Sequence, residues 1–150
     1  MDSDIKKKET FSVLGVQFRV DKGSETSELF AGIWERFESY GEIIESLSTE
    51  KQYFGVNFPT PNEEVTDYMA GMMVAKDTSV PDGLVKRTVP GGDYAVFMCP
   101  VEEIGKCYLH IFTRWLPAAP VLFNSKNPVI EEYPEKNSTG PVRIYIPVMK

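Results

Sequence analysis

The ten residues FSVLGVQFRV, from Phe11 to Val20, are rich in β-branched and aromatic side chains and predict a strand. A helix is expected after the turn residues 21–23, capped by Ser24 or Ser27. Apolar side chains recur there at helical spacing and predict one buried stripe, made of Leu29, Phe30, Ile33, Trp34 and Phe37. Trp34 is expected in the core, and Gly41 either ends the helix or precedes a second short one reaching Leu47.

Two further strands follow in the first part of the chain. They are expected at Tyr53–Phe58 and Thr66–Ala75, separated by Pro59, Pro61 and Asn62. Residues 77–83 carry serine, proline, aspartate and glycine, and are the most linker-like stretch of the sequence.

The same order of elements then repeats. Strands are expected at Leu84–Val89 and Tyr94–Cys99 around a turn at 90–93, followed by a helix from about Glu102 to Trp115 that Pro117 ends. The apolar stripe of this helix is Ile104, Cys107, Tyr108, Ile111, Phe112 and Trp115. Val129–Tyr133 and Val142–Val148 are expected to form the last strand pair, with a polar loop around Asn137 to Gly140.

The repeated pattern of strand, helix, strand and strand predicts an α+β protein. We expect one domain over residues 1–150, built from two βαββ modules related by a pseudo-twofold axis, at about 8–76 and 84–148. Each module is expected to form a small antiparallel sheet covered by one helix. A groove between two such modules is a common place for a ligand.

Charge and composition exclude several classes of function. With 22 acidic and 16 basic residues the net charge is −6, which argues against direct nucleic-acid binding. The run Lys6 to Lys8 is interpreted as a solvated lead-in to the first strand. A single histidine, His110, excludes a multi-histidine metal site, and neither the spacing nor the context of Cys99 and Cys107 indicates a metal site or redox pair. No cofactor is expected.

The sequence carries no signal peptide and no apolar run long enough to span a bilayer. These observations predict a cytoplasmic protein that does not act at a membrane.

Five motifs, in this order, resemble those of the GyrI-like family of small-molecule-binding domains. They are VPDGL (80–84), VPGGDYAVF (89–97), WLP (115–117), PVIEEY (128–133) and IYIPV (144–148). Domains of this family are the effector-binding modules of AraC-type and multidrug-responsive transcription activators. The similarity extends from Phe11 to Val148.

The resemblance implies a hydrophobic pocket between the two modules, with an acidic residue that meets cationic ligands. The family pattern of glutamate, one variable residue and tyrosine falls on Glu131 and Tyr133. Activators of the family carry a helix-turn-helix region ahead of this module, and the first strand here starts too early to leave room for one. The expectation is a stand-alone binder, either a homodimer or the partner of a DNA-binding protein.

Strand alternation places Glu131 and Tyr133 on one face and Ile130 and Glu132 on the other. If Ile130 packs beneath a helix, Glu131 and Tyr133 face the groove. The other candidate wall residues are Tyr68, Met72, Tyr94, Trp115 and Tyr145, although each of them is also explained by core packing. Tyr68 and Met72 share a strand face, and the sequence does not say whether that face meets the groove.

Three functions are consistent with these residues. The first is a binding protein for lipophilic cationic or aromatic molecules, because a desolvated carboxylate among aromatic rings favours a bound positive charge. The second is a hydrolase of reactive small molecules, as in some relatives, with Glu131 as base and Tyr68 or Tyr94 as hydrogen-bond donor. The third is an inhibitor that acts on a macromolecule, as the gyrase-inhibiting relatives do.

Overall fold

The first half of the chain contains four strands and two helices. The computed structural model describes residues 3–134 and 140–149. In chain order the elements are β1 (Asp4–Lys8), β2 (Phe11–Asp21), a 3-10 turn (Lys22–Ser24), α1 (Ser27–Glu38), α2 (Gly41–Leu47), β3 (Ser48–Pro59) and β4 (Val65–Val74). The expected strands and both helices are confirmed, and β1 is an addition to them.

The second half repeats this order. Its elements are β5 (Val85–Val89), β6 (Gly92–Pro100), a 3-10 turn (Val101–Glu103), α3 (Ile104–His110), a π-helical segment (Ile111–Trp115), α4 (Leu116–Ala118), β7 (Leu122–Phe123), β8 (Val129–Tyr133) and β9 (Pro141–Met149). The short strand β7 was not expected. Pro117 lies in the first turn of α4, where its missing N–H is tolerated, so the helical turns continue past it. Residues 137–139 of the expected polar loop lie outside the described residues.

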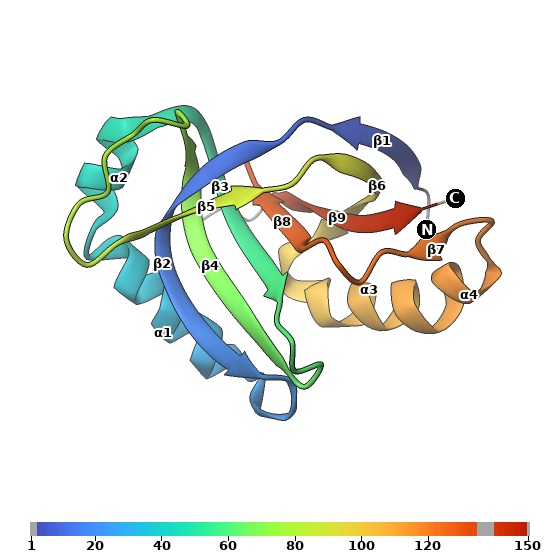
Figure 1. Ribbon diagram of the computed structural model, residues 1–150. Helices are drawn as coiled ribbons and strands as arrows, with labels where there is room; N and C mark the ends of the chain where they lie inside the picture. Colours follow the sequence, from blue (N-terminus) through green and yellow to red (C-terminus); the bar gives the residue numbers. More distant parts are fainter. Residues whose placement is uncertain (1–2, 135–139, 150) are drawn as a thin grey trace.

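The strands form one antiparallel sheet in the order β1-β6-β9-β8-β3-β4-β2-β5, with β7 beside β9 (Figure 1). The α+β class is confirmed, but the two small sheets that the sequence predicts are joined. The joint is the pairing of β3 with β8, in which Gly55 lies opposite Glu131. An open strand edge exposes unpaired N–H and C=O groups, and the edges of the two halves satisfy each other here.

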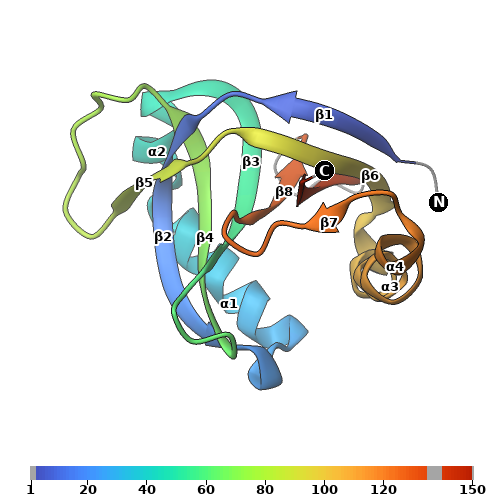
Figure 2. The same ribbon diagram turned by 45° about the vertical axis from the view of Figure 1, so that its right-hand side comes forward.

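The run Lys6 to Lys8 is part of the strand β1 rather than a lead-in to a strand, although Lys6 and Lys7 are exposed as expected. It pairs with β6 of the other half, with Lys8 opposite Gly92, just as β5 pairs with β2. Between the β1–β6 and β2–β5 strand pairs, the Gly91 N–H donates a hydrogen bond of 2.9 Å to Thr10 Oγ1. The first strand of each half, β1 or β5, therefore pairs with a strand of the other half, and the sheet is curled (Figure 2).

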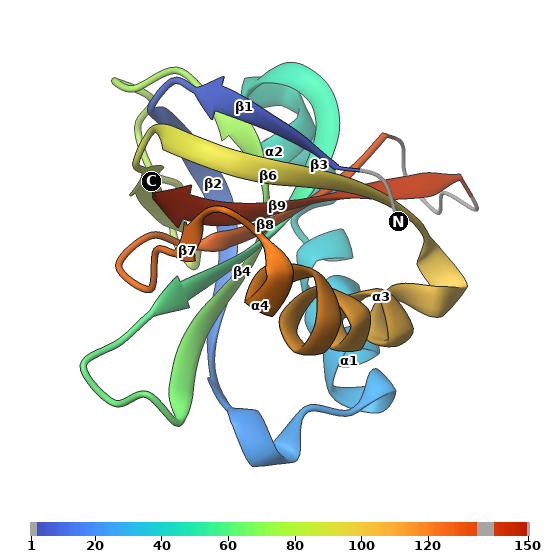
Figure 3. The same ribbon diagram turned by 90° about the vertical axis from the view of Figure 1, so that its right-hand side faces the viewer.

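Both helical layers cover the same face of the curled sheet (Figure 3). Ile33 and Phe37 of α1 pack on β2 and β4, and Ile111 packs on β6 and β9. The opposite face closes on itself around a third core, which contains Phe54, Met69 and Ile130. Ile130 does not pack beneath a helix, so that condition is not met; the curl of the sheet buries this face without one.

The cap of helix α1 lies between the two expected caps, Ser24 and Ser27. The Thr26 side chain caps it by accepting a hydrogen bond of 3.1 Å from the Leu29 N–H. Ser24 lies in the preceding 3-10 turn and Ser27 is already helical, so neither is the cap. Within the described ranges, no helix has the length and apolar character needed to cross a bilayer.

Cys99 and Cys107 form a disulfide. The expectation that they are not a redox pair was wrong, because the 3-10 turn after β6 reverses the chain and lays α3 against the end of that strand. Both residues are buried in the core beneath α3, with exposed fractions of 0% and 5%. The bond ties the first turns of α3 to the sheet.

Candidate functional site

A cleft of about 1600 Å³ lies on the helix-covered face of the sheet. One wall comes from α1 and the 3-10 turn before it, and the other from α3 and the segment from Phe123 to Asn127. Its floor is formed by β3, β4 and β8 near the joint between the halves. The helices of both halves thus face one shared cavity, and the expected groove is present.

Glu131 lies on the floor of this cleft and is only 7% exposed. Three phenol groups donate hydrogen bonds to its carboxylate. The Tyr133 and Tyr68 hydroxyls reach Oε1 at 2.9 and 3.3 Å, and the Tyr108 hydroxyl reaches Oε2 at 2.7 Å. These donors come from β8, β4 and α3, so the carboxylate joins elements of both halves.

Gly55 makes this arrangement possible. It lies on β3, between the strands that carry Tyr68 and Glu131. A Cβ atom at this position would collide with the Tyr68 hydroxyl and come within 2.8 Å of Glu131 Oε1. The missing side chain leaves room for the Tyr68 ring to lean across β3 to the carboxylate.

Burial raises the pKa of Glu131, because desolvation penalises the charged form; the hydrogen bonds from Tyr108, Tyr133 and Tyr68 oppose this effect. Burial and the nearby carboxylate raise the pKa values of Tyr68 and Tyr108 well above the usual range. The phenols therefore remain protonated donors, while the acid lacks a positive partner among the described residues that contact it. Such a group gains from a bound cation or from a proton.

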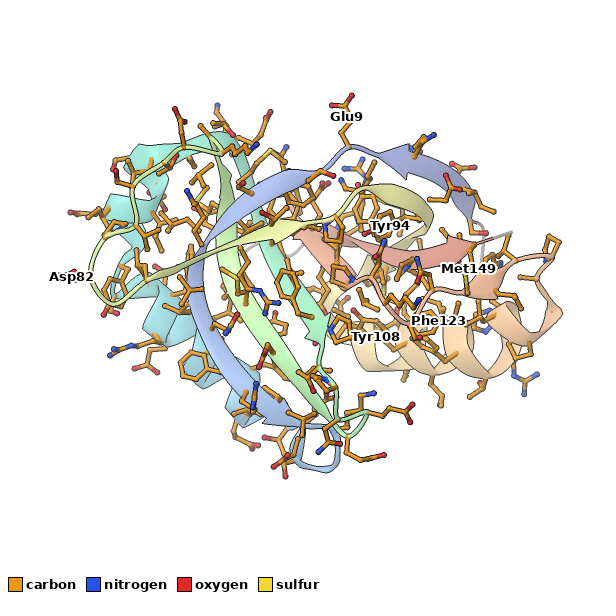
Figure 4. All side chains as sticks on the ribbon, in the orientation of Figure 1. Glu9, Asp82, Tyr94, Tyr108, Phe123 and Met149 are labelled. Atoms are coloured by element: carbon orange, nitrogen blue, oxygen red, sulfur yellow. A yellow bond between two sulfur atoms is a disulfide. The ribbon has the colours of Figure 1, made fainter. Side chains whose placement is uncertain are left out.

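Aromatic rings make up much of the wall. Trp34 of α1 meets Tyr133 edge to face at 5.5 Å, and Phe30 meets Tyr68 at 5.0 Å. On the opposite side, Phe112 stacks with Tyr108 and meets Phe123 edge to face. Figure 4 labels Tyr108 and Phe123, which Phe112 connects on the α3 side of the cleft.

The charged groups of the cleft are mostly acidic. Among the described residues that line it, five are glutamates and one is a lysine, Lys22. The glutamates are Glu25, Glu35, Glu38, Glu63 and Glu131. This excess of negative charge attracts cations into the cleft and repels anions.

The cleft contains three of the seven predicted site residues, Glu131, Tyr133 and Tyr68. The other four lie away from it. Tyr94 and Tyr145 belong to the helix-free core, where the Tyr94 hydroxyl donates to the Pro90 carbonyl at 3.0 Å. Met72 packs beneath α1 and α2.

Trp115 packs edge to face on Phe97 in the core beneath α3. The strand pattern places Met72 on the same face as Tyr68, but that face continues from the cleft into the helix-covered core. All four residues are packed in the core, which was the alternative explanation that the sequence left open.

Sequence reasoning missed Tyr108 and recognised only part of the role of Trp34. Both were interpreted as members of a buried helical stripe, yet Tyr108 donates to Glu131, and Trp34 packs against the core as expected but also lines the cleft. A stripe that faces a sheet also faces any cavity left between the helix and the sheet. The available signal was the polar atom on each ring, which requires a partner when it is buried.

Known proteins resemble this chain in sequence and in fold. It is 28% identical over 156 residues to the transcriptional regulator BrlR of Pseudomonas aeruginosa. The alignment covers 99% of this chain and 56% of BrlR. The chain thus spans about half the length of that relative.

Two solved structures share the fold. The structure of SAV2435 bound to tetraphenylphosphonium matches with a TM-score of 0.77 at 16% identity, covering 99% of this chain and 94% of SAV2435. An integron cassette protein from the mobile metagenome of Vibrio cholerae matches with a TM-score of 0.70 at 18% identity, covering 98% and 95%. Residues 4–148 match the family described as integron-associated effector binding proteins. Because this match covers nearly the whole chain and confirms the GyrI-like resemblance, the protein belongs to that family of effector-binding proteins.

Proposed function

We propose that the protein binds lipophilic cationic or aromatic small molecules in the cleft between α1 and α3, with Glu131 as the charge partner. The observation that carries this proposal is the buried Glu131 carboxylate, held by three phenols in an acidic, aromatic cavity. SAV2435, which shares the fold, has been solved with the lipophilic cation tetraphenylphosphonium.

The energetics favour a cation over a neutral aromatic molecule. Two opposite charges about 4 Å apart attract by roughly 4 kcal/mol at an effective dielectric near 20, before the cost of desolvation. An aromatic face in contact with the cation adds about 0.5 to 2 kcal/mol. Neither contribution depends on a fixed ligand shape, so the cleft is suited to several unrelated cations.

The role we propose is sensing or sequestration of such molecules. BrlR is a transcriptional regulator about twice as long as the region matched here. The acidic charge of the present chain disfavours direct contact with nucleic acid. We therefore propose that any effect on transcription passes through a DNA-binding partner, whether the chain acts as a monomer or as a homodimer.

The test is calorimetric titration of wild type and Glu131→Gln with tetraphenylphosphonium and with neutral triphenylphosphine oxide. We expect wild type to prefer the cation and Glu131→Gln to lose at least about tenfold in affinity for it, which corresponds to 1.4 kcal/mol. Glu28→Gln, which removes an exposed charge of α1 outside the cleft, is the matched control. Equal binding of both probes to wild type, or an unchanged affinity in Glu131→Gln, would overturn the proposal.

A hydrolase is the second candidate, because phenol donors surround a buried carboxylate that could act as a base. Mass spectrometry of strained cyclopropane electrophiles incubated with the protein tests this activity. A hydrolase would convert them, and Glu131→Gln would abolish turnover while leaving binding of the intact compound largely unchanged. No conversion by the wild-type protein would exclude this function for the compounds tried.

A further inference from the structure

The strand register divides the floor of the cleft into rows. Tyr53 and Tyr133 form one row, and Gly55 and Glu131 form the next. Along β3 the following cleft-lining positions are Asn57 and then Pro59, which pairs with Thr66 of β4. The charged centre therefore lies in the middle of the floor rather than at its end.

The floor changes character along these rows. On the side of Tyr53, the wall is aromatic and includes Trp34 and Tyr133. On the side of Thr66, the lining residues are mostly polar and come from the turn between β3 and β4 and from the segment before α1. The Lys22 N–H donates to the Glu64 carbonyl at 2.9 Å and holds these two segments together.

Thr66 gives this polar end an unused hydrogen-bonding group. Its Oγ1 atom is buried and has no hydrogen-bond partner in the described part of the chain. Leaving a buried hydroxyl without a hydrogen-bond partner is unfavourable, so a ligand group that pairs with it is favoured. Glu25 and Glu63, both exposed side chains, line the same end and outnumber its one lysine, Lys22, whose charge opposes the desolvation effect that raises the pKa of Glu25.

The cleft has room for more than one compact ligand group. Its volume of about 1600 Å³ exceeds the roughly 300 to 1000 Å³ of pockets that hold one drug-sized molecule. A single compact cation at Glu131 would leave the polar end empty.

We propose that the cleft takes elongated molecules with two positive groups, an aromatic cation at Glu131 and a terminal ammonium at a polar subsite formed by Thr66, Glu25 and Glu63. This inference rests on the proposed function and adds a second binding position to it. The row of Thr66 lies four positions along β3 from the row of Glu131, so the two positive groups are expected roughly 13 Å apart along the strand direction.

The two ends of the cleft are linked electrostatically. Desolvation is the main cause that raises the pKa of Glu131, and the charge of Glu25 raises it further. Desolvation also raises the pKa of Glu25 itself. A ligand with a positive group at each end offsets both the mutual repulsion of the two carboxylates and the desolvation penalty, whereas a monocation at Glu131 offsets only part of them.

The experiment uses three sets of N-alkylquinolinium probes of increasing chain length, ending in an ammonium, a hydroxyl or a methyl group. Wild type is expected to bind the ammonium probe about fivefold or more tighter than the methyl probe, with the greatest advantage where the two nitrogens are about 13 Å apart. The hydroxyl probe is expected to fall between them, because it pairs with Thr66 but carries no second charge.

Two variants separate the parts of the subsite. Glu25→Gln combined with Glu63→Gln is expected to remove most of the ammonium advantage and leave the methyl probe almost unaffected. Thr66→Val is expected to weaken the ammonium and hydroxyl probes but not the methyl probe. The control, Glu28→Gln combined with Glu42→Gln, makes the same change in net charge at exposed positions outside the cleft.

The outcomes distinguish this proposal from the function on which it rests. If no quinolinium probe binds wild type, the proposed function fails. If all three sets bind equally at every length, only the polar subsite is overturned. If the control pair weakens the ammonium probe as much as the Glu25 and Glu63 pair, the advantage comes from the overall charge of the protein, and the subsite is likewise overturned.

Discussion

The Tyr108 hydroxyl donates a hydrogen bond of 2.7 Å to Oε2 of Glu131, the shortest of the three bonds that hold this carboxylate. The bond connects α3 to β8, across the cleft from the α1 wall. Tyr108 directly follows Cys107, whose disulfide anchors the same turn of α3 to β6. The position of the site acid is therefore tied to the position of a helix.

Tyr108→Phe is expected to weaken binding of tetraphenylphosphonium and to lower stability. The substitution keeps the ring but removes a donor that favours the ionised carboxylate, so the pKa of Glu131 rises further and less of the anion is present. A hydrogen bond to a charged group contributes about 1.5 to 3 kcal/mol. Urea unfolding and calorimetric titration measure the two effects.

Tyr94→Phe is the matched control, because the Tyr94 hydroxyl bonds the Pro90 carbonyl outside the cleft. It is expected to leave ligand affinity unchanged. An affinity loss equal to that of Tyr108→Phe would place Tyr94 in the site after all and contradict the assignment made from the cleft.

Gly55→Ala is expected to destabilise the protein by about 1 to 3 kcal/mol and to weaken cation binding, because the new methyl group forces Tyr68 and Glu131 apart. Gly32→Ala is the control: nothing lies within 4 Å of a Cβ atom at that position of α1, so it is expected to gain stability. Thermal unfolding and titration of both variants measure the effects. Unchanged stability and affinity in Gly55→Ala would show that the floor adjusts without cost.

Cation affinity is expected to rise with pH and then level off. The folded protein raises the pKa of Glu131 above its ordinary value of 4.5, and a bound cation favours the carboxylate. Binding therefore releases a proton at any pH below the raised pKa, and affinity becomes constant above it. Titrations between about pH 5 and 8, in buffers of different ionisation enthalpy, measure this release.

The same shift predicts the opposite trend for the ligand-free protein. The native state holds the Glu131 proton more tightly than the unfolded state does, so this contribution to the free energy of unfolding is complete below the unfolded pKa. It is lost as the pH rises through the folded pKa. Glu131→Gln should remove both trends, whereas Glu25→Gln should keep them; a persistent trend in Glu131→Gln would assign it to another group.

Reduction of the Cys99–Cys107 disulfide is expected to lower the free energy of unfolding by about 2.5 kcal/mol, the chain-entropy value for a loop of eight residues. Because α3 carries Tyr108, reduction should also weaken cation binding. Unfolding and titration with and without a phosphine reductant test this expectation. The variant with both Cys99→Ala and Cys107→Ala should not respond to reductant. If the stability and affinity of wild type were also unchanged by reductant, the role assigned to the bond would be contradicted.

The sequence predicted most of the elements because local patterns carry their signals. The apolar stripe of α1 and the alternation in PVIEEY depend only on residues a few positions apart, and both were confirmed. The family motif selected Glu131, and alternation correctly paired it with Tyr133 on one face. The pairing of β1 and the cap at Thr26 depend on partners or turn geometry that these patterns do not encode.

What the sequence by itself determined is the order of strands and helices and the repeat of two halves, and through the family resemblance it singled out Glu131 as the candidate acid. The tertiary structure decided that β3 and β8 join the halves, that Cys99 meets Cys107, and that Tyr68 and Tyr108 converge on Glu131. Periodicity reports which side chains share a face, whereas the contents of a cavity depend on how that face curls and which distant strands pair. Tyr68 lies 63 residues from Glu131, and only the curled sheet with the open Gly55 position brings the two together.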